Sequence, residues 1–171
     1  VYGIGTGFLA EDSIKRIYEI KGRDFNKPLA ILTRSLKELE DYAYISEDAY
    51  KLANAFWPGG LTIILKSKEN YYKLTGEKTI GVRKPKHNLA LELLKLYGPL
   101  KTTSVNQSGE EPMNDYDLIV KKYFNKVDQI FPNEEVSSRV SSTVVDLTQE
   151  NINILREGDI KLSDIMKVLS K

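Results

Sequence analysis

The sequence has no cysteine and a single histidine, His87, among its 171 residues. The absence of cysteine excludes a disulfide scaffold, a thiolate metal site and a cysteine nucleophile. One histidine excludes a multi-histidine metal site, and because no serine lies in a G-x-S-x-G elbow, a catalytic triad is not expected. His87 is therefore expected to be an exposed loop residue. The chemistry must come from arginine, lysine, hydroxyl and amide side chains.

Long hydrophobic runs are also missing. The longest, residues 61–65, contains Thr62 and is far shorter than the roughly 20 residues that a membrane-spanning helix needs. No basic-then-apolar leader is present, so we expect a cytoplasmic protein with no membrane partner. The 25 Lys and Arg nearly balance the 24 Asp and Glu. The net charge of +1 therefore gives no overall attraction to nucleic acid.

Arginine is scarce, because only six of the 25 cations are arginine. In a chain so rich in lysine, an arginine more often serves where a planar fork must bind a carboxylate or a phosphate with two hydrogen bonds. This preference marks six positions for attention: Arg16, Arg23, Arg34, Arg83, Arg139 and Arg156.

Helical and strand patterns alternate along the chain, which predicts an α/β domain. Helices are expected at residues 12–21, 35–41, 46–56, 88–97, 116–123 and 162–169, with Ser46 and Asn88 as N-caps and Gly22 ending the first helix. Strands are expected at residues 29–33, 61–65, 79–82, 101–105, 127–131, 142–147 and 151–155. The last two strands are neighbours, which argues against a purely parallel sheet. The prediction is one domain over residues 1–171 with a twisted mixed sheet and flanking helices.

Three glycine-containing segments are interpreted as structural. Residues 3–7 read G-I-G-T-G, which does not fit G-x-G-x-x-G, so a flexible connection from strand to helix is favoured. In residues 76–79, Glu77 interrupts the Gly-Lys pair that a Walker A loop requires. Residues 56–62 contain the only tryptophan and a Pro-Gly-Gly turn, and we interpret them as a core anchor with a tight backbone.

Three cations crowd the turn that follows the first predicted helix. Lys21 is explained by a helix C-terminus, whose dipole favours a positive charge. Arg23 and Lys27 are not required for that purpose, and they lie beside the rigid Pro28. An anion cradle for a polyphosphate, with Arg23 binding bidentately and Lys27 as a point charge, is an equally good interpretation.

Further candidates lie at the ends of predicted strands, where α/β proteins bind ligands. Arg83 ends a strand in which Gly81 indicates the close approach of another group, which favours a carboxylate clamp. Residues 101–109 hold more hydroxyl and amide side chains than a capped turn needs, and they suggest a hydrogen-bonding edge that faces a ligand. Residues 141–146 open another strand with hydroxyls, and Arg156 closes the strand after it.

Taken together, these segments resemble the threonylcarbamoyl-AMP synthase family, whose domain is called YrdC-like. The resemblance spans residues 1–158, and its strength lies in the order and spacing of seven motifs. These are residues 1–5 (VYGIG), 21–29 (KGR…KPL), 56–62 (FWPGGLT), 81–85 (GVRKP), 104–109 (SVNQSG), 142–146 (STVVD) and 155–158 (LREG).

The resemblance implies a twisted α/β sheet around a deep, positively lined cavity. It also implies a nucleotidyltransferase that makes threonylcarbamoyl-AMP and pyrophosphate from L-threonine, bicarbonate or CO2, and ATP. The product would serve the threonylcarbamoyl modification of tRNA, so tRNA and downstream threonylcarbamoyl-transfer proteins are possible partners. Mg2+ would be held mainly by the nucleotide phosphates, because no carboxylate cluster has the spacing of metal ligands.

The same resemblance assigns roles to individual residues. The K-x-R motif, Lys21 and Arg23, and the S-x-N motif, Ser104 and Asn106, are expected to be catalytic. The positions that match ATP contacts are Arg23, Lys27, Thr79, Ser104 and Arg156. The positions that match threonine contacts are Leu32, Arg83, Thr102 and Ser142.

The two ends of the chain differ from the longer family members. The sequence begins at Val1 without methionine, in what reads as the end of a strand, so the natural polypeptide is expected to start earlier and to include the family's P-T-x-T segment. No extra C-terminal domain is expected after Arg156.

Two other functions remain open. The first is a non-catalytic domain of the same fold that binds double-stranded RNA or tRNA with a steep salt dependence and no need for threonine. The near-neutral charge and the lack of RNA-binding aromatic motifs argue against it. The second is a carbamoyl-adenylate-forming module of a larger maturation enzyme, against which the length of the chain argues.

Overall fold

A seven-stranded mixed sheet forms the centre of the protein. The computed structural model describes residues 2–133 and 140–170, so Val1 and Arg139 lie outside the described residues. The strands are β1 (Gly3–Gly7), β2 (Ala30–Leu32), β3 (Leu61–Lys66), β4 (Thr79–Arg83), β5 (Leu100–Ser104), β6 (Thr143–Asp146) and β7 (Asn153–Arg156). Their order is β1-β5-β2-β4-β3-β6-β7, with β2–β4 and β3–β6 parallel and the other pairs antiparallel. The predicted mixed sheet is confirmed.

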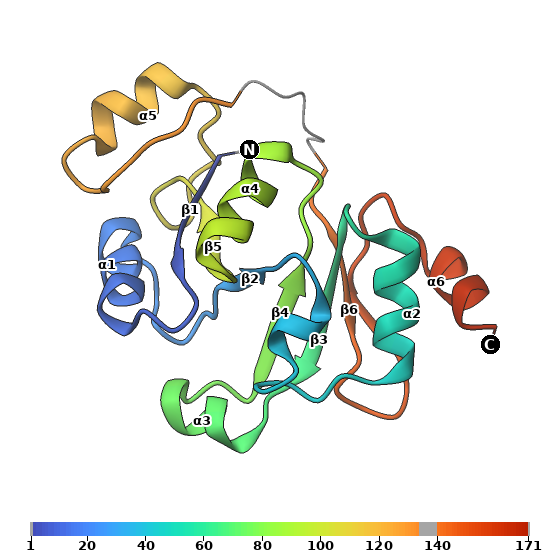
Figure 1. Cartoon of the computed structure of the whole chain (residues 1–171). Coiled ribbons are helices and arrows are strands. Elements are labelled where there is room, and N and C mark those ends of the chain that lie inside the picture. Colours follow the sequence, from blue (N-terminus) through green and yellow to red (C-terminus); the bar gives the residue numbers. More distant parts are fainter. Residues whose placement is uncertain (1, 134–139, 171) are drawn as a thin grey trace.

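Six α-helices and one 3-10 helix flank the sheet within the described residues. They are α1 (Glu11–Lys21), the 3-10 helix η1 (Leu36–Leu39), α2 (Glu47–Phe56), α3 (Glu69–Thr75), α4 (Asn88–Tyr97), α5 (Tyr116–Tyr123) and α6 (Leu162–Leu169). Figure 1 shows α1 and α5 beside the β1 end of the sheet, and α2 and α6 beside the β3–β6 end.

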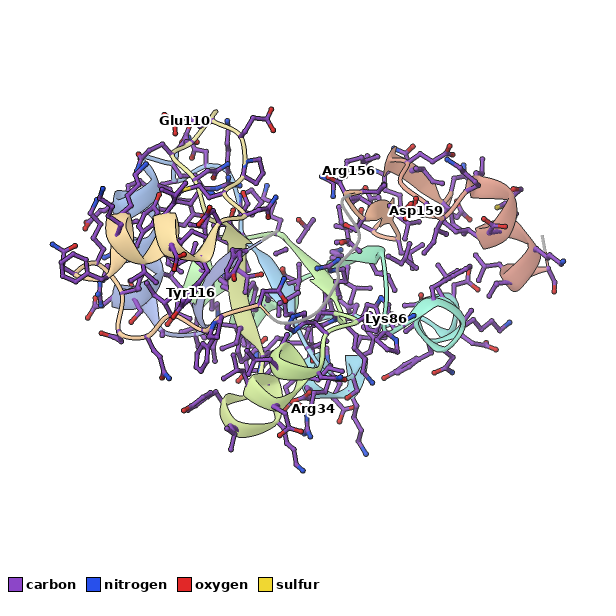
Figure 2. The ribbon with its side chains drawn as sticks, turned by 90° about the horizontal axis from the view of Figure 1, so that it is seen from above. Arg34, Lys86, Glu110, Tyr116, Arg156 and Asp159 are labelled. Atoms are coloured by element: carbon purple, nitrogen blue, oxygen red, sulfur yellow. The ribbon has the colours of Figure 1, made fainter. Side chains whose placement is uncertain are left out.

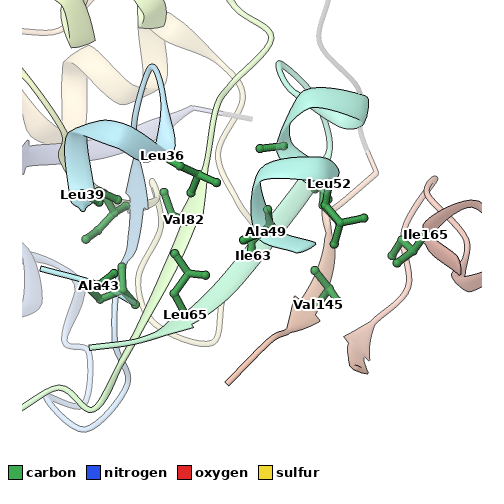
Figure 3. Close-up of a cluster of buried hydrophobic side chains, with 14 of the residues drawn as sticks. Leu36, Leu39, Ala43, Ala49, Leu52, Ile63, Leu65, Val82, Val145 and Ile165 are labelled. Carbon is green, nitrogen blue, oxygen red and sulfur yellow. The ribbon is translucent and has the colours of Figure 1, made fainter. Parts of the chain in front are cut away.

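The main core lies between one face of the sheet and α2, η1 and α6. Leu52 of α2, Ile63 of β3, Val145 of β6 and Ile165 of α6 are fully buried there (Figure 3). Each such side chain contributes about 1.5–3 kcal/mol by leaving water. Two smaller clusters, one around Ile17, Tyr18 and Leu29 and one around Val105, Ile119 and Tyr123, attach α1 and α5 to the β1 end.

Most local predictions match the structure. Ser46 caps α2 by accepting a hydrogen bond from the amide of Ala49 at 3.2 Å. Gly22 ends α1 with φ of +60°, a conformation that glycine adopts without strain. The ends of α5 and α6 lie at the predicted residues, and β6 and β7 form the predicted neighbouring pair.

Five predictions were wrong or incomplete. Residues 3–7 were interpreted as a flexible connection, but they form strand β1, which pairs with β5 along its whole length. Residues 127–131 are not a strand, because Ile130 packs against the cluster of Val105, Ile119 and Tyr123 and needs no place in the sheet. Helix α3 was not predicted; it buries only Tyr71, so its sequence lacks an apolar face. The helix expected at residues 35–41 is the short η1. Helix α4 is capped by His87, whose Nδ1 accepts from the amide of Ala90, and not by Asn88.

Candidate functional site

The sheet has a second face, opposite the core, that small residues leave open. Side chains alternate along a strand, so burial of Ile31, Val82 and Ile63 on the core side turns their neighbours to this face. Thr102 of β5 pairs with both Gly5 and Ala30, and both of these residues are exposed. A Cβ on Gly5 would lie 2.7 Å from the Thr102 Cγ2, so glycine is required for Thr102 to pack there. We call this surface the open face.

A hydrogen-bonded group of polar side chains lies where β3, β6 and β7 meet. The Arg156 Nε donates to the Ser142 carbonyl at 2.9 Å, and its Nη2 donates to the Ser142 Oγ at 3.1 Å. The Ser142 Oγ is also 2.8 Å from the Oγ1 of Thr62. Together with Arg83, these residues form what we call the β6 end of the open face.

Gly158 holds the β6 end in place. A Cβ at this position would lie 2.2 Å from the Ser141 carbonyl oxygen and 3.0 Å from the Thr143 nitrogen, so only glycine fits beneath this backbone. The Gly158 amide donates to the Thr143 Oγ1 at 2.8 Å, and that hydroxyl donates to the Ile160 carbonyl at 2.7 Å. The close contact of Gly158 with Ser141 and Thr143 fixes Ser142, which lies between them in the chain.

Arg83 is half-buried at the end of β4, beside its register partner Leu32 of β2. Burial lowers the pKa of Arg83 below its ordinary value, and the positive charge of Arg156 lowers the pKa further. Within residues 2–133 and 140–170, no carboxylate forms an ion pair with Arg83 or Arg156. Two neighbouring guanidinium groups without an acid are suited to bind an anion.

Helix α1 packs on the core side of β1, against Ile4, and its last residue, Lys21, reaches the end of β5 and the loop that follows it. The Lys21 side chain is only 3% exposed, and its Nζ donates to the Thr103 Oγ1 at 3.2 Å, the Ser104 carbonyl at 2.5 Å and the Asn106 Oδ1 at 2.7 Å. Burial, and secondarily the charge of Arg23, lower the pKa of Lys21 to about 8. All three donors of the ammonium group are used inside the fold.

The predicted S-x-N motif is the acceptor side of this network. The Ser104 Oγ donates to the Asn106 Oδ1 at 3.3 Å, and the Asn106 Nδ2 donates to the Glu110 carbonyl at 2.7 Å. The Ser108 amide donates to the Lys21 carbonyl at 2.8 Å, which ties the loop to α1 a second time. The structure therefore brings the K-x-R and S-x-N motifs together, with Lys21 and Asn106 as the link.

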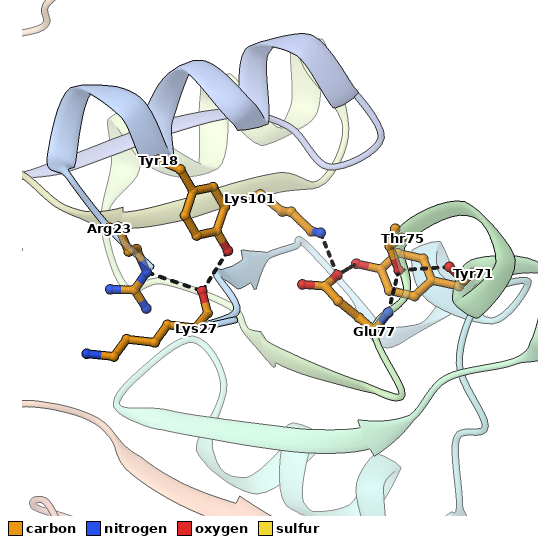
Figure 4. Close-up of polar contacts among 7 residues, drawn as sticks. All are labelled: Tyr18, Arg23, Lys27, Tyr71, Thr75, Glu77 and Lys101. Carbon is orange, nitrogen blue, oxygen red and sulfur yellow. Dashed lines mark hydrogen bonds and ion pairs between the residues drawn. The ribbon is translucent and has the colours of Figure 1, made fainter. Parts of the chain in front are cut away.

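Arg23 and Lys27 lie at the turn between α1 and β2 (Figure 4). The Arg23 Nε donates to the Lys27 carbonyl at 3.3 Å, and its Nη2 donates to the Pro28 carbonyl at 3.1 Å. The Tyr18 hydroxyl donates to the same Lys27 carbonyl at 2.6 Å. These bonds hold the turn, and the ammonium group of Lys27 is exposed. We call Lys21, Arg23, Lys27, Ser104 and Asn106 the α1 end of the open face.

The predicted site residues thus fall into two groups with Thr102 between them. Continuing the sheet register two residues beyond Ala30 puts Pro28, Thr79 and Ser104 at the same level, so the exposed Thr79 belongs with the α1 end. Arg156 was expected among the ATP contacts, but it lies in the β6 end beside Ser142. Figure 2 shows Arg156 on the opposite side of the molecule from Arg34, which pairs with Glu38 at 3.6 Å.

Sequence reasoning gave no individual role to Thr62 or Gly158, and it missed a largely buried ion pair on the core side. Lys101 is 4% exposed, and its Nζ lies 2.6 Å from the Glu77 Oε2, which also accepts from the Tyr71 hydroxyl (Figure 4). Burial raises the pKa of Tyr71 above its ordinary value, and the charge of Glu77 adds to the effect. Glu77 was noticed only as an interruption of a Walker motif. Thr62 stands in the FWPGGLT motif, which was interpreted as an anchor; Trp57 does donate its Nε1 to the Leu61 carbonyl at 2.7 Å.

The deep, positively lined cavity stays a prediction. An open hollow of about 400 Å3 is lined by residues that are not among the predicted site residues: Tyr44, Lys66, Ser67, Glu69, Tyr72 and Lys78. Among residues 2–133 and 140–170, no three acidic or histidine side chains are placed to hold a metal ion. In the same part of the chain, every helix is too short or too polar to span a bilayer.

Comparisons with known proteins agree with the fold and with the motifs. The family model for Sua5, YciO and YrdC, described as "Telomere recombination", matches residues 1–158. A Methanocaldococcus jannaschii protein, provisionally named threonylcarbamoyl-AMP synthase, is 36% identical over 167 residues, which cover 98% of this chain and 80% of that protein. The threonylcarbamoyl-AMP synthase of Pyrococcus abyssi is 37% identical over 175 residues, which cover 100% of this chain and 52% of that protein.

A solved structure shows the same architecture. The crystal structure of Pyrococcus abyssi Sua5 in complex with L-threonine has a TM-score of 0.88 and 38% identity, over 99% of this chain and 51% of that one. The chain therefore spans about half the length of the Pyrococcus abyssi protein. The likeness confirms the predicted α/β fold over nearly all of the chain.

Proposed function

Because the chain belongs to the Sua5/YciO/YrdC family, we propose that it makes threonylcarbamoyl-AMP and pyrophosphate from L-threonine, bicarbonate or CO2, and ATP. The name of the Pyrococcus abyssi relative states this product, and the structure of that relative contains L-threonine. In this chain, the observation that carries the proposal is the β6 end. Arg83 and Arg156 lie close enough for one charge to lower the pKa of the other, and no described carboxylate pairs with either.

The reaction needs no nucleophile from the protein. The threonine amine adds to the carbon of CO2 and loses a proton, which gives a carbamate. A carbamate oxygen then attacks the α-phosphorus of ATP, and the bond from that phosphorus to the bridging oxygen breaks as pyrophosphate leaves. Negative charge builds on phosphate oxygens, so the protein must align the reactants and stabilise that charge. Cations, hydroxyls and amides serve these purposes. This chain has all three kinds of group, and the reaction does not need the cysteine that it lacks.

We assign the β6 end to the amino acid. Arg83 would bind the threonine carboxylate through two parallel hydrogen bonds, as guanidinium groups do. Thr102 and Ser142 would orient the other polar groups, and Leu32, the register partner of Arg83, would contact the side chain. The small residues of the open face leave space above this floor.

We assign the α1 end to the nucleotide. Arg23 and Lys27 would hold phosphates beyond the α-phosphate, while Thr79 and Ser104 would contact the nucleotide from the same level of the sheet. Arg156 lies in the β6 end and would act at the junction, where the carbamate meets the α-phosphate. Mg2+ would be bound mainly by phosphate oxygens, which are ligands of the kind that it prefers. The adenylate would pass to proteins that modify tRNA.

The test is the Arg83→Ala substitution, with pyrophosphate release followed as L-threonine is varied. Loss of a bidentate charged contact should raise KM for threonine by roughly 30-fold or more, since bonds to charged groups contribute about 1.5–3 kcal/mol. Arg34→Ala is the matched control, because Arg34 is an exposed arginine whose partner is Glu38. Its threonine dependence should equal that of the wild type.

A contrary result would be unchanged threonine dependence in Arg83→Ala, which would remove the carboxylate clamp. Pyrophosphate release by the wild type that needs no amino acid, or none under any condition, would remove the proposed reaction itself.

A further inference from the structure

Two groups at the β6 end, the Thr62 hydroxyl and the Arg156 guanidinium, share a single oxygen, the Oγ of Ser142. Arg156 has only hydrogen-bond donors in its side chain, so its Nη2 donates to this oxygen at 3.1 Å. The remaining contact is the 2.8 Å distance to the Thr62 Oγ1, in which either hydroxyl can be the donor by distance alone. The direction of this second hydrogen bond decides what Ser142 presents to a ligand.

Burial decides the direction. Thr62 is 9% exposed, whereas Ser142 is half-exposed. Within the described part of the chain, the Ser142 Oγ is the one acceptor within hydrogen-bond distance of the Thr62 hydroxyl. A buried donor without an acceptor costs about 1–3 kcal/mol, so the Thr62 proton belongs on the bond to Ser142. Ser142 then accepts from both Thr62 and Arg156, and its lone pairs are used.

We infer that Thr62 is a positioning residue that makes Ser142 a hydrogen-bond donor toward the ligand. With both lone pairs occupied, the only group that Ser142 can offer outward is its own O–H. Arg83 and Arg156 also carry donors alone, so these three side chains present only donors to a ligand. Such a site selects a carboxylate and rejects an ammonium or amide group in the same place.

The β3–β6 pairing explains why Thr62 can do this. Leu61 pairs with Thr143 and Thr62 with Val144 in a parallel register, which brings position 62 beside Ser142 although 80 residues separate them. The Thr62 Cγ2 would lie 3.8 Å from a Cβ on Gly81, an ordinary packing distance on the side toward β4. Its methyl group is therefore directed toward β4, and its hydroxyl toward β6.

The inference rests on the proposed function only in taking L-threonine as the ligand. The test measures L-threonine binding by calorimetry for the wild type, Thr62→Val, Thr62→Ser, Ser142→Ala and the double variant Thr62→Val/Ser142→Ala. Thr62→Val keeps the shape and removes the hydroxyl, and it should weaken binding about 5- to 10-fold, the value of one hydrogen bond. Thr62→Ser keeps the hydroxyl and should bind within about 2-fold of the wild type. The double variant should bind no more weakly than Ser142→Ala.

Three results would overturn the inference: Thr62→Val binding as tightly as the wild type, Thr62→Ser binding as weakly as Thr62→Val, or losses that add in the double variant. Urea unfolding of each variant establishes that it is folded. L-Threonine amide provides a second check, because a donor-only site should reject it even in the wild type.

A ligand-free measurement separates this inference from the proposed function. In the wild type, two donors hold the Ser142 side chain, so three-bond couplings in NMR should report one dominant χ1 rotamer. Thr62→Val removes one donor and should average the rotamers. An identical Ser142 rotamer distribution in both proteins would overturn the inference. Failure of the wild type to bind L-threonine would instead overturn the proposed function and leave this result standing.

Discussion

The α1 end and the β6 end differ in how far the hydrogen-bond donors of their cations are used inside the protein. At the α1 end, Lys21 gives all three of its donors to oxygens of the fold, and Arg23 gives two to backbone carbonyls. At the β6 end, Arg156 is anchored on Ser142, while Arg83 has no carboxylate partner among the described residues.

This difference separates two tasks. Cations whose donors are used inside the protein build the shape of a loop, and their charge reaches a ligand only at a distance. Arg83, whose pKa is lowered by burial and then by the neighbouring charge of Arg156, is stabilised when an anion arrives between the two guanidinium groups. Under the proposed assignment, the α1 end is organised before a nucleotide binds, whereas the β6 end would gain most of its stabilisation from a bound carboxylate.

The largest expected effect comes from crowding the backbone beneath the β6 end. In Gly158→Ala, the new Cβ would lie 2.2 Å from the Ser141 carbonyl oxygen. The Cβ is fixed to the backbone and the oxygen is part of it, so no side-chain rotation can relieve the overlap. We expect the free energy of unfolding in urea to fall by about 3 kcal/mol, at the upper limit of ordinary overpacking. The displaced Ser142 should also raise KM for threonine more than KM for ATP.

Gly60→Ala is the control for this substitution, because no atom of the described residues, apart from the chain neighbours of Gly60, lies within 4 Å of a Cβ built there. It should change the free energy of unfolding by less than about 0.5 kcal/mol, as surface substitutions do. If Gly158→Ala raised both KM values equally, the division of the open face into two ends would not hold.

The second effect is the loss of the link at the α1 end. Lys21→Met fills similar space but leaves the Ser104 carbonyl and the Asn106 Oδ1 without their charged donor. Orphaned buried acceptors cost about 1–3 kcal/mol each, so we expect the free energy of unfolding to fall by about 2 kcal/mol. Because the loop carries Ser104, KM for ATP should rise more than KM for threonine, the reverse of the pattern for Gly158→Ala.

Lys15→Met serves as its control. Lys15 lies on the same helix and forms an exposed pair with Glu11 at 3.9 Å, which is worth at most about 0.5 kcal/mol. Equal losses in the Lys15 and Lys21 variants would show that helix α1, and not the buried network, is what the substitutions disturb.

The two ends were predictable from sequence to different degrees. Local signals identified α1, Gly22 and the crowding of cations after it, because caps and helical periodicity depend on neighbours in the chain. The same kind of signal failed at residues 127–131, where an apolar pattern typical of a strand serves packing on Val105 and Ile119. Alternation reports that side chains will be buried, but not which element buries them.

Most residues of the β6 end could be identified from the sequence, but their arrangement in space could not. Arg83, Ser142 and Arg156 were singled out from scarcity and from the family motifs. The role of Thr62 arises from the parallel pairing of β3 with β6, which no local pattern encodes. Gly158 was seen as part of a motif, yet its necessity depends on the Ser141 backbone that passes over it. Contacts between distant segments are set by the sheet topology, and the sequence pattern does not contain that information.

The smallest expected effect is a pH dependence that belongs to the α1 end alone. Burial lowers the pKa of Lys21 to about 8 from the 10.5 of a free lysine, so between these values the unfolded chain binds a proton that the folded protein has released. Stability rises with pH wherever the unfolded state holds more protons. The free energy of unfolding should therefore increase between pH 8 and pH 9 by at most about 1.4 kcal/mol from this one group.

Urea unfolding of the wild type and of Lys21→Met at several pH values between 7 and 10 measures this contribution. The difference between the two proteins removes every other titrating group, and it should grow in favour of the wild type as pH rises. Neutral Lys21 has two donors for three acceptors, so KM for ATP should rise over the same interval while KM for threonine stays constant. If the difference in unfolding free energy between the two proteins is constant from pH 7 to 10, Lys21 titrates as an exposed lysine. In that case Lys21 does not form the buried link that distinguishes the α1 end from the β6 end.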